Sequence, residues 1–75
     1  MPGFVIEYNR RSRDYRVTTF DGEGGHREAF ERRLELEADR EDTNIEIVSL
    51  TSDSLDTVKK THSRYFAGRE LLAAI

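Results

Sequence analysis

The segment from Phe4 to Phe20 constrains the fold more than any other, because it has two β-favouring runs around a short polar loop. One antiparallel register satisfies an aromatic pair, a β-branched pair and an opposite-charge pair together, and all three kinds are favourable across strands. These pairs are Tyr8 with Tyr15, Ile6 with Val17, and Glu7 with Arg16. The sequence therefore predicts a β-hairpin whose loop runs from Arg10 to Arg13. The inward face carries Phe4, Ile6, Tyr8, Tyr15 and Val17, and the other face carries Val5, Glu7, Arg16, Thr18 and Phe20.

Two helices and a third strand are expected after the hairpin. The glycine-rich turn at 21–25 leads into a helix from His26 to about Arg40. Its predicted buried stripe, with one residue every four positions, is Phe30, Leu34 and Ala38. A strand at 44–50 follows, and Ser52 or Ser54 suits the start of the second helix. The apolar side of that helix is expected to carry Leu55, Val58, His62, Tyr65, Arg69 and Leu72, with Gly68 either kinking the helix or ending it early.

The predicted fold is a single α+β domain spanning residues 1–75, with element order ββαβα. If the third strand lies beside the first, the sheet has three antiparallel strands in the order 2-1-3. We expect both helices to pack on one face, the face that holds Ile6, Tyr8, Val17 and Ile47. The opposite face would then expose four apolar side chains, Val5, Phe20, Val48 and Leu50. A cluster of this kind indicates a partner or a homodimer.

Composition narrows the class of protein. The chain has no Cys, which excludes a disulfide framework and a cysteine-type zinc site. No leader pattern and no apolar run of membrane length is visible, so a cytoplasmic location without membrane contact is expected. Arginine outnumbers lysine ten to two, which suggests a GC-rich bacterial genome.

The net charge of −3 conceals a segregation along the chain. Residues 1–33 carry seven arginines against six acids, residues 34–56 carry one against eight, and residues 57–75 carry four basic residues against one acid. A uniformly basic nucleic-acid binder would not have this pattern. A protein that meets its partner through one charged face would.

The arginine-rich hairpin tip is open to three interpretations. Its arginines could bind nucleic-acid phosphates together with the start of the second helix, with Tyr8 and Tyr15 stacking on single-stranded bases. The residues of this candidate nucleic-acid site are Arg10, Arg11, Arg13, Arg16, Lys59, Lys60 and Arg64. The same charges could bind an acidic protein, or they could simply keep the hairpin soluble and discourage strand aggregation. Nearby acids and the acidic middle segment favour the last interpretation.

The sequence gives little support for any other binding or catalytic site. The turn at 21–25 matches no phosphate-binding motif, and the two histidines, His26 and His62, lack metal-ligand spacing. No serine sits in a nucleophile motif, and a domain of this size has little room for an enclosed pocket. We therefore expect no enzymatic activity, no metal and no cofactor. A small-ligand site near His62 is a third, less favoured class.

Taken together, the sequence favours a non-enzymatic domain that binds itself or another protein, with nucleic-acid binding as the alternative. Only one of Tyr65 and Phe66 can point fully inward, and arginine and aromatic residues often dominate contacts. The predicted protein interface is Val5, Phe20, Val48, Leu50 and Phe66.

Overall fold

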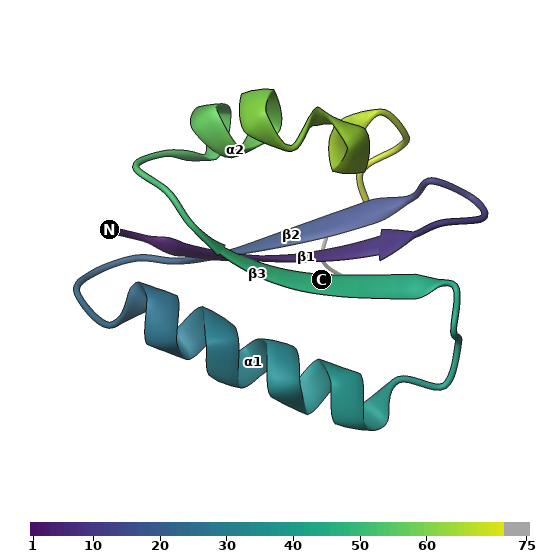
Figure 1. Cartoon of the computed structure of the whole chain (residues 1–75), viewed down its shortest axis with the longest axis horizontal. Coiled ribbons are helices and arrows are strands. Elements are labelled where there is room, and N and C mark those ends of the chain that lie inside the picture. Colours follow the sequence, from purple (N-terminus) through teal and green to yellow (C-terminus); the bar gives the residue numbers. More distant parts are fainter. Residues whose placement is uncertain (72–75) are drawn as a thin grey trace.

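The computed structural model describes residues 1–71 and places a three-stranded antiparallel sheet between two helical layers (Figure 1). The strands are β1 (Gly3–Asn9), β2 (Tyr15–Phe20) and β3 (Ile45–Thr51), in the order β2-β1-β3. The helices are α1 (Gly25–Asp39), α2 (Leu55–Thr61) and the short 3-10 helix η1 (Ser63–Phe66). The predicted α+β class, element order and strand order are confirmed. Among the described residues, no helix combines the length and the apolarity that a membrane crossing requires.

The hairpin has the predicted register. Tyr8 pairs with Tyr15, Ile6 with Val17 and Glu7 with Arg16. The Asn9 side chain closes the loop, because its oxygen accepts hydrogen bonds from the backbone N–H groups of Arg11 and Ser12 at 2.9 and 3.0 Å. Arg13 takes a left-handed backbone conformation with φ of 67°, which lets the chain turn back into β2.

The prediction that both helices pack on one face is wrong. α1 covers one face of the sheet, and α2 with η1 covers the other (Figure 1). The reason lies in β1, where Phe4, Val5 and Ile6 alternate between the faces and are all at most 1% exposed. Because both faces of the central strand are apolar, one helical layer cannot bury them both.

The open apolar sheet face predicted from sequence is therefore absent from the described structure. Ile6 lies opposite Val48 and Phe4 lies opposite Leu50, so Val48 and Leu50 share the α2 side. Val5 is fully buried on the α1 side, with Phe20 packed beside it. Ile47 was predicted to share a face with Ile6, but it lies on the α1 side as well. The residues assigned to one interface are divided between two covered faces.

The predicted buried stripe of α1 is also wrong. The helix buries Gly25 and Ala29 and packs Leu36 against the sheet, whereas Phe30 and Leu34 are each 47% exposed. Gly25 explains the rotation, because a side chain there would clash with the carbonyl oxygen of Phe20. This close approach turns Gly25 and Ala29 inward and leaves Phe30 and Leu34 on the outer side.

The second helix is shorter than the sequence suggested. Ser54 caps α2 by accepting the backbone N–H of Thr57 at 3.2 Å, which confirms one of the two predicted caps. Helix α2 ends at Thr61, whose hydroxyl donates to the Thr57 carbonyl at 2.9 Å, and η1 then runs across the sheet. Gly68 therefore neither kinks nor ends α2, and Leu72 lies outside the described residues.

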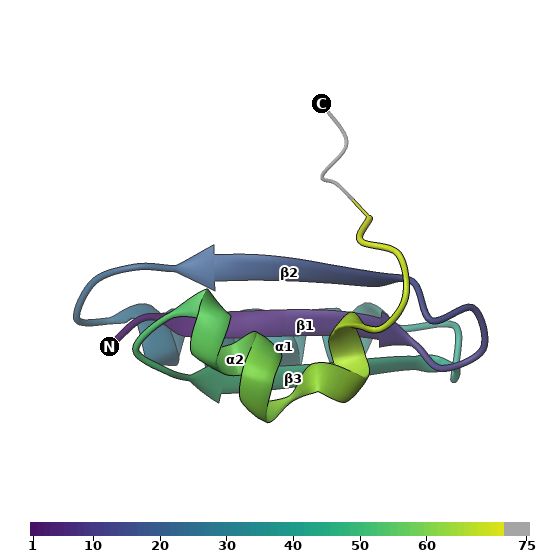
Figure 2. The same cartoon turned by 90° about the horizontal axis from the view of Figure 1, so that it is seen from above.

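The segment after η1 crosses to the outer edge of β2 (Figure 2). Tyr15 donates its backbone N–H to the Arg69 carbonyl at 3.0 Å and accepts the Leu71 N–H at 2.6 Å. Gly68 makes this route possible, since a side chain there would clash with the Arg13 carbonyl oxygen. The hairpin loop and the end of the described chain thus lie against each other.

Candidate anion-binding cleft

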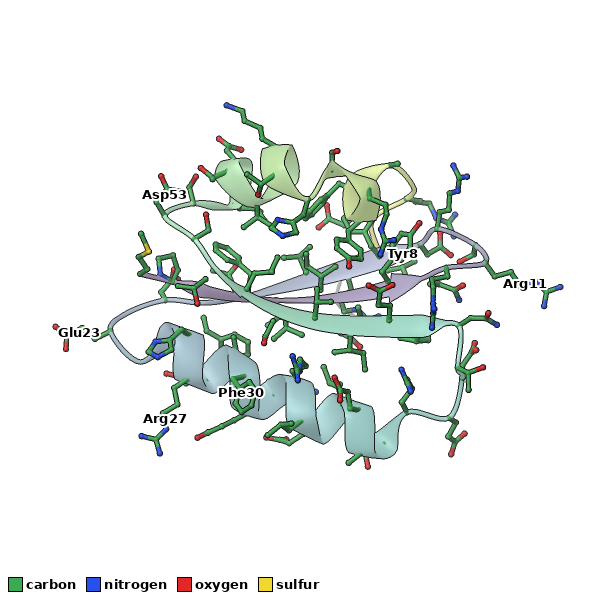
Figure 3. All side chains as sticks on the ribbon, viewed as in Figure 1. Tyr8, Arg11, Glu23, Arg27, Phe30 and Asp53 are labelled. Carbon is green, nitrogen blue, oxygen red and sulfur yellow. The ribbon has the colours of Figure 1, made fainter. Side chains whose placement is uncertain are left out.

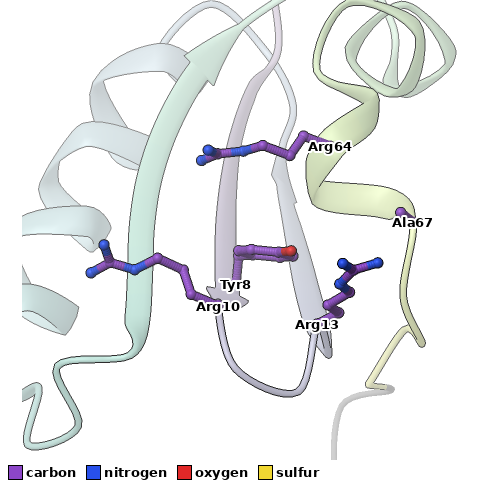
Figure 4. A pocket seen from close by; sticks show the side chains of 5 residues that line it. All are labelled: Tyr8, Arg10, Arg13, Arg64 and Ala67. Atoms are coloured by element: carbon purple, nitrogen blue, oxygen red, sulfur yellow. The ribbon is translucent and has the colours of Figure 1, made fainter.

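An open cleft of about 390 Å³ lies where η1 passes over the loop end of β1 (Figure 4). Its lining residues are Tyr8, Arg10, Arg13, Arg64 and Ala67. Figure 4 shows Tyr8 in the middle, with Arg10 and Arg13 on either side of it and Arg64 above. The hairpin and η1 thus bring Arg64 close to two arginines of the hairpin loop that are far from it in the sequence.

Two of these arginines are positioned by backbone contacts. Arg10 donates its N–H to the Asn44 carbonyl and its Nη2 to the Thr43 carbonyl, each at 2.9 Å. Arg13 donates its N–H to the Asn9 carbonyl at 2.7 Å, and its main chain lies against Gly68. No hydrogen bond or ion pair of the Arg13 guanidinium is found within residues 1–71. The backbone of Arg13 is therefore fixed, and its guanidinium N–H groups remain available to a ligand in the cleft.

Arg64 belongs to a polar network that ties η1 to β3. Its Nη2 lies 3.0 Å from both carboxylate oxygens of Glu46, and its guanidinium stacks 4.7 Å from the centre of the Tyr65 ring. The Tyr65 hydroxyl donates to Glu46 at 2.5 Å. Burial, followed by the hydrogen bond to Glu46, raises the pKa of Tyr65 above its usual range. The hydrogen bond with Tyr65 raises the pKa of Arg64 still further, which keeps the guanidinium charged.

The cleft carries an excess of positive charge. Three guanidinium groups line it, and Glu46, which pairs with Arg64, offsets one of them. The N–H groups of Arg10 and Arg64 other than Nη2 make no hydrogen bond within the described residues. Such an arrangement can hold an anion by charge-assisted hydrogen bonds. No group of three or more potential metal ligands is found in the described part of the chain.

The other predicted basic residues lie elsewhere. Arg11 projects from the end of the hairpin (Figure 3), and Arg16 lies on the opposite sheet face, where it pairs with Glu7 in the register. Lys59 sits 5.9 Å from the centre of the Phe66 ring, and Lys60 is exposed on α2. The structure thus brings together only three of the seven residues predicted for nucleic-acid binding, Arg10, Arg13 and Arg64.

The tyrosines of the hairpin do not offer their ring faces for base stacking. Tyr8 and Tyr15 are each 7% exposed. The Tyr65 ring packs against Tyr8 with centroids 5.3 Å apart, and Phe66 packs against Tyr15 at 5.0 Å. Phe66, which was assigned to an interface, is therefore a half-buried cover for Tyr15.

Sequence reasoning missed the role of Glu46. Glu46 lies on the same face as Val48 and Leu50, but its pairing with Arg64 depends on where η1 begins. The β1–β3 register, which the structure gives, places Tyr8 opposite Glu46 on the face that η1 covers. The short 3-10 segment that brings Arg64 to this point has no comparable sequence pattern.

A second candidate surface lies on the outer side of α1. Phe30 and Leu34 are among the most exposed large apolar side chains of the described chain, and they are one helical turn apart. Arg27 precedes them by one turn and points away from the sheet (Figure 3), and Glu37 follows them by one turn. We call Arg27, Phe30, Leu34 and Glu37 the outer stripe of α1.

Within the described part of the chain, the surroundings of the two histidines give no indication of a binding site. His26 is exposed at the start of α1. The His62 ring stacks on Tyr65 with centroids 6.5 Å apart, and its Nδ1 lies 2.8 Å from the Thr61 hydroxyl. These contacts fit a residue that ends α2 and supports the Tyr65 ring.

Comparison with protein-family models, curated proteins and solved structures finds no match for this chain.

Proposed function

We propose that this chain is a non-enzymatic cytoplasmic domain that acts through protein contacts, and that it forms a homodimer by pairing the outer stripes of α1 in two copies. The observation that carries the proposal is the 47% exposure of both Phe30 and Leu34 on a helix whose other side is already packed on the sheet. Apolar residues at this spacing on an outer helix face favour contact with another helix.

The charges on α1 select an antiparallel pairing with a second copy. When Phe30 of one copy lies opposite Leu34 of the other, Arg27 lies opposite Glu37 at both ends of the contact. The spacing of three and four residues from Arg27 to Glu37 is the spacing of a helix–helix seam. A parallel pairing would instead place like charges together, which is unfavourable.

The present partners of these charges do not prevent the pairing. Arg27 lies 3.3 Å from Glu31, and Glu37 lies 3.2 Å from Arg33, within the same helix. Both are surface ion pairs, which contribute at most about 1 kcal/mol. The groups can therefore turn toward a partner helix at little cost.

The size of the contact sets its expected strength. A pairing over three turns of one helix is smaller than a standard interface of roughly 1,600 Å². We therefore expect a reversible dimer with a dissociation constant of about 10–100 μM.

Charge reversal tests this pairing. Arg27→Glu and Glu37→Arg each place like charges opposite one another and should weaken the dimer about tenfold or more in sedimentation velocity experiments. The double variant Arg27→Glu/Glu37→Arg restores opposite charges and should dimerise again. A wild-type protein that stays monomeric up to about 1 mM, well above the expected dissociation constant, would contradict the proposal.

Arg32→Glu with Glu35→Arg is the matched control. These residues form an exposed ion pair on α1 at 3.3 Å but lie outside the outer stripe. Each single change and the double change should leave the dimer unaffected. If they weaken it as much as the stripe variants do, the effect comes from net charge and not from the seam.

A further inference from the structure

We propose that the cleft between the hairpin loop and η1 binds the phosphate group of a small phosphorylated molecule, with Arg10, Arg13 and Arg64 as its contacts. The proposal does not depend on the dimer, since the cleft and the outer stripe of α1 lie on opposite sides of the sheet. It also differs from the nucleic-acid site predicted from sequence, which included four further basic residues.

The number and placement of the arginines favour phosphate over carboxylate. A carboxylate offers two oxygens in one plane, and a single guanidinium satisfies both of them. A phosphate group offers three terminal oxygens in a tetrahedral arrangement. Guanidinium groups on two sides of Tyr8 and above it can approach these oxygens from separate directions (Figure 4).

The surroundings favour a compact ligand over a nucleic-acid strand. The volume of about 390 Å³ is at the lower end of small-molecule sites. Asp42 lies beside the Thr43–Asn44 segment that anchors Arg10, and its carboxylate accepts the Asn44 N–H at 2.8 Å. Asp14 follows Arg13 and lies 3.7 Å from Arg69. These acids would repel the neighbouring phosphates of a polymer, and the covered tyrosine rings offer no stacking surface.

Glu46 is the residue that would compete with the ligand. Its carboxylate contacts Nη2 of the Arg64 guanidinium, and its side chain is 26% exposed. An incoming phosphate gains from Arg64 but is repelled by Glu46. Removing the Glu46 charge should therefore strengthen binding, whereas removing an arginine should weaken it.

Calorimetric titration with inorganic pyrophosphate at low salt tests the proposal. We expect saturable binding to the wild type, a loss of about tenfold or more in Arg13→Gln, and tighter binding in Glu46→Gln. Arg11→Gln is the matched control, because it removes the same charge from the same loop at a side chain that points away from the cleft. It should bind within about twofold of the wild type.

Two further ligands distinguish phosphate binding from carboxylate binding and from nucleic-acid binding. Citrate, which carries carboxylates only, should bind at least about tenfold more weakly than pyrophosphate. A dodecamer of single-stranded thymidylate should show no gain over pyrophosphate. Absence of saturable pyrophosphate binding would overturn the proposal, as would equal binding of citrate. A tighter oligonucleotide complex that depends on Arg11 would also overturn it and would restore the nucleic-acid interpretation.

Discussion

Single glycines decide how closely the layers of this small protein approach one another. Gly25 lies so near the end of β2 that a side chain would meet the Phe20 carbonyl and the main chain of Gly3. Its neighbour Gly24 has open space, with only the Glu28 side chain at 3.7 Å from an added methyl group. Adjacent glycines in the same turn thus serve different purposes, and only one of them is required for packing.

This difference gives a prediction at the scale of one residue. Gly25→Ala should destabilise the fold by about 2–3 kcal/mol, because backbone on both sides must move to accept the methyl group. Gly24→Ala should cost about 1 kcal/mol or less, the usual loss at a helix start. Urea denaturation of the two variants checks the ordering, and equal costs would show that α1 does not sit as close to β2 as described.

Individual elements differ in how far their positions could be predicted. The hairpin register followed from cross-strand pairs, because a slip of one residue would have broken the aromatic, aliphatic and charged pairs together. The orientation of α1 could not be predicted from periodicity, because the Phe30–Leu34–Ala38 stripe is as regular as the true inward face. The tight contact between Gly25 and Phe20 determines the orientation of α1, and this is a tertiary contact that sequence periodicity does not reveal.

The 3-10 element η1 is held by side chains rather than by its own backbone. Tyr65 reaches Glu46 in β3, and Phe66 packs on Tyr15 in β2. Four residues of 3-10 helix have little intrinsic stability. These contacts fix the position of η1, and with it the Arg64 side of the cleft.

The raised pKa of Tyr65 gives this element a pH dependence. The folded state holds the Tyr65 proton more tightly than the unfolded state, in which the pKa is 10.0. Between the two pKa values the unfolded state binds fewer protons, so the stabilising contribution is present below pH 10 and is lost as the pH rises further. Urea denaturation from neutral to alkaline pH should show this loss in the wild type.

Tyr65→Phe is the control for that measurement. The variant lacks the titrating hydroxyl, so its stability should fall less steeply above the ordinary tyrosine pKa. At neutral pH it should be less stable by about 1–2 kcal/mol, because Glu46 loses a donor. Identical alkaline profiles for the variant and the wild type would rule out Tyr65 as the source of the pH dependence.

At the scale of the whole molecule, the wrong prediction of the layers and the wrong prediction of an open apolar sheet face have one cause. The sequence-based prediction placed both helices on one face of the sheet and so left the other face open. It assigned Val5 to that open face. The structure covers both faces, and the exposed apolar pair Phe30 and Leu34 lies instead on the outer side of α1. The candidate contact surface moves from the sheet to a helix because, among the exposed large apolar side chains of the described residues, Phe30 and Leu34 are the two that lie one turn apart on one element.

The proposed dimer should make the stability of the whole protein depend on its concentration. A chain of 75 residues buries a small core, so an added helix–helix contact is a large fraction of its total stability. Above the dissociation constant, each tenfold rise in concentration should add about 0.7 kcal/mol per chain to the unfolding free energy. The midpoint of urea unfolding should therefore rise with protein concentration in the wild type. Leu34→Glu changes a half-exposed position on the outer stripe, so it should unfold at a midpoint that is independent of concentration while keeping the helical content of the wild type. A midpoint that is equally independent of concentration in both proteins would show that the outer stripe of α1 does not pair two copies of this chain.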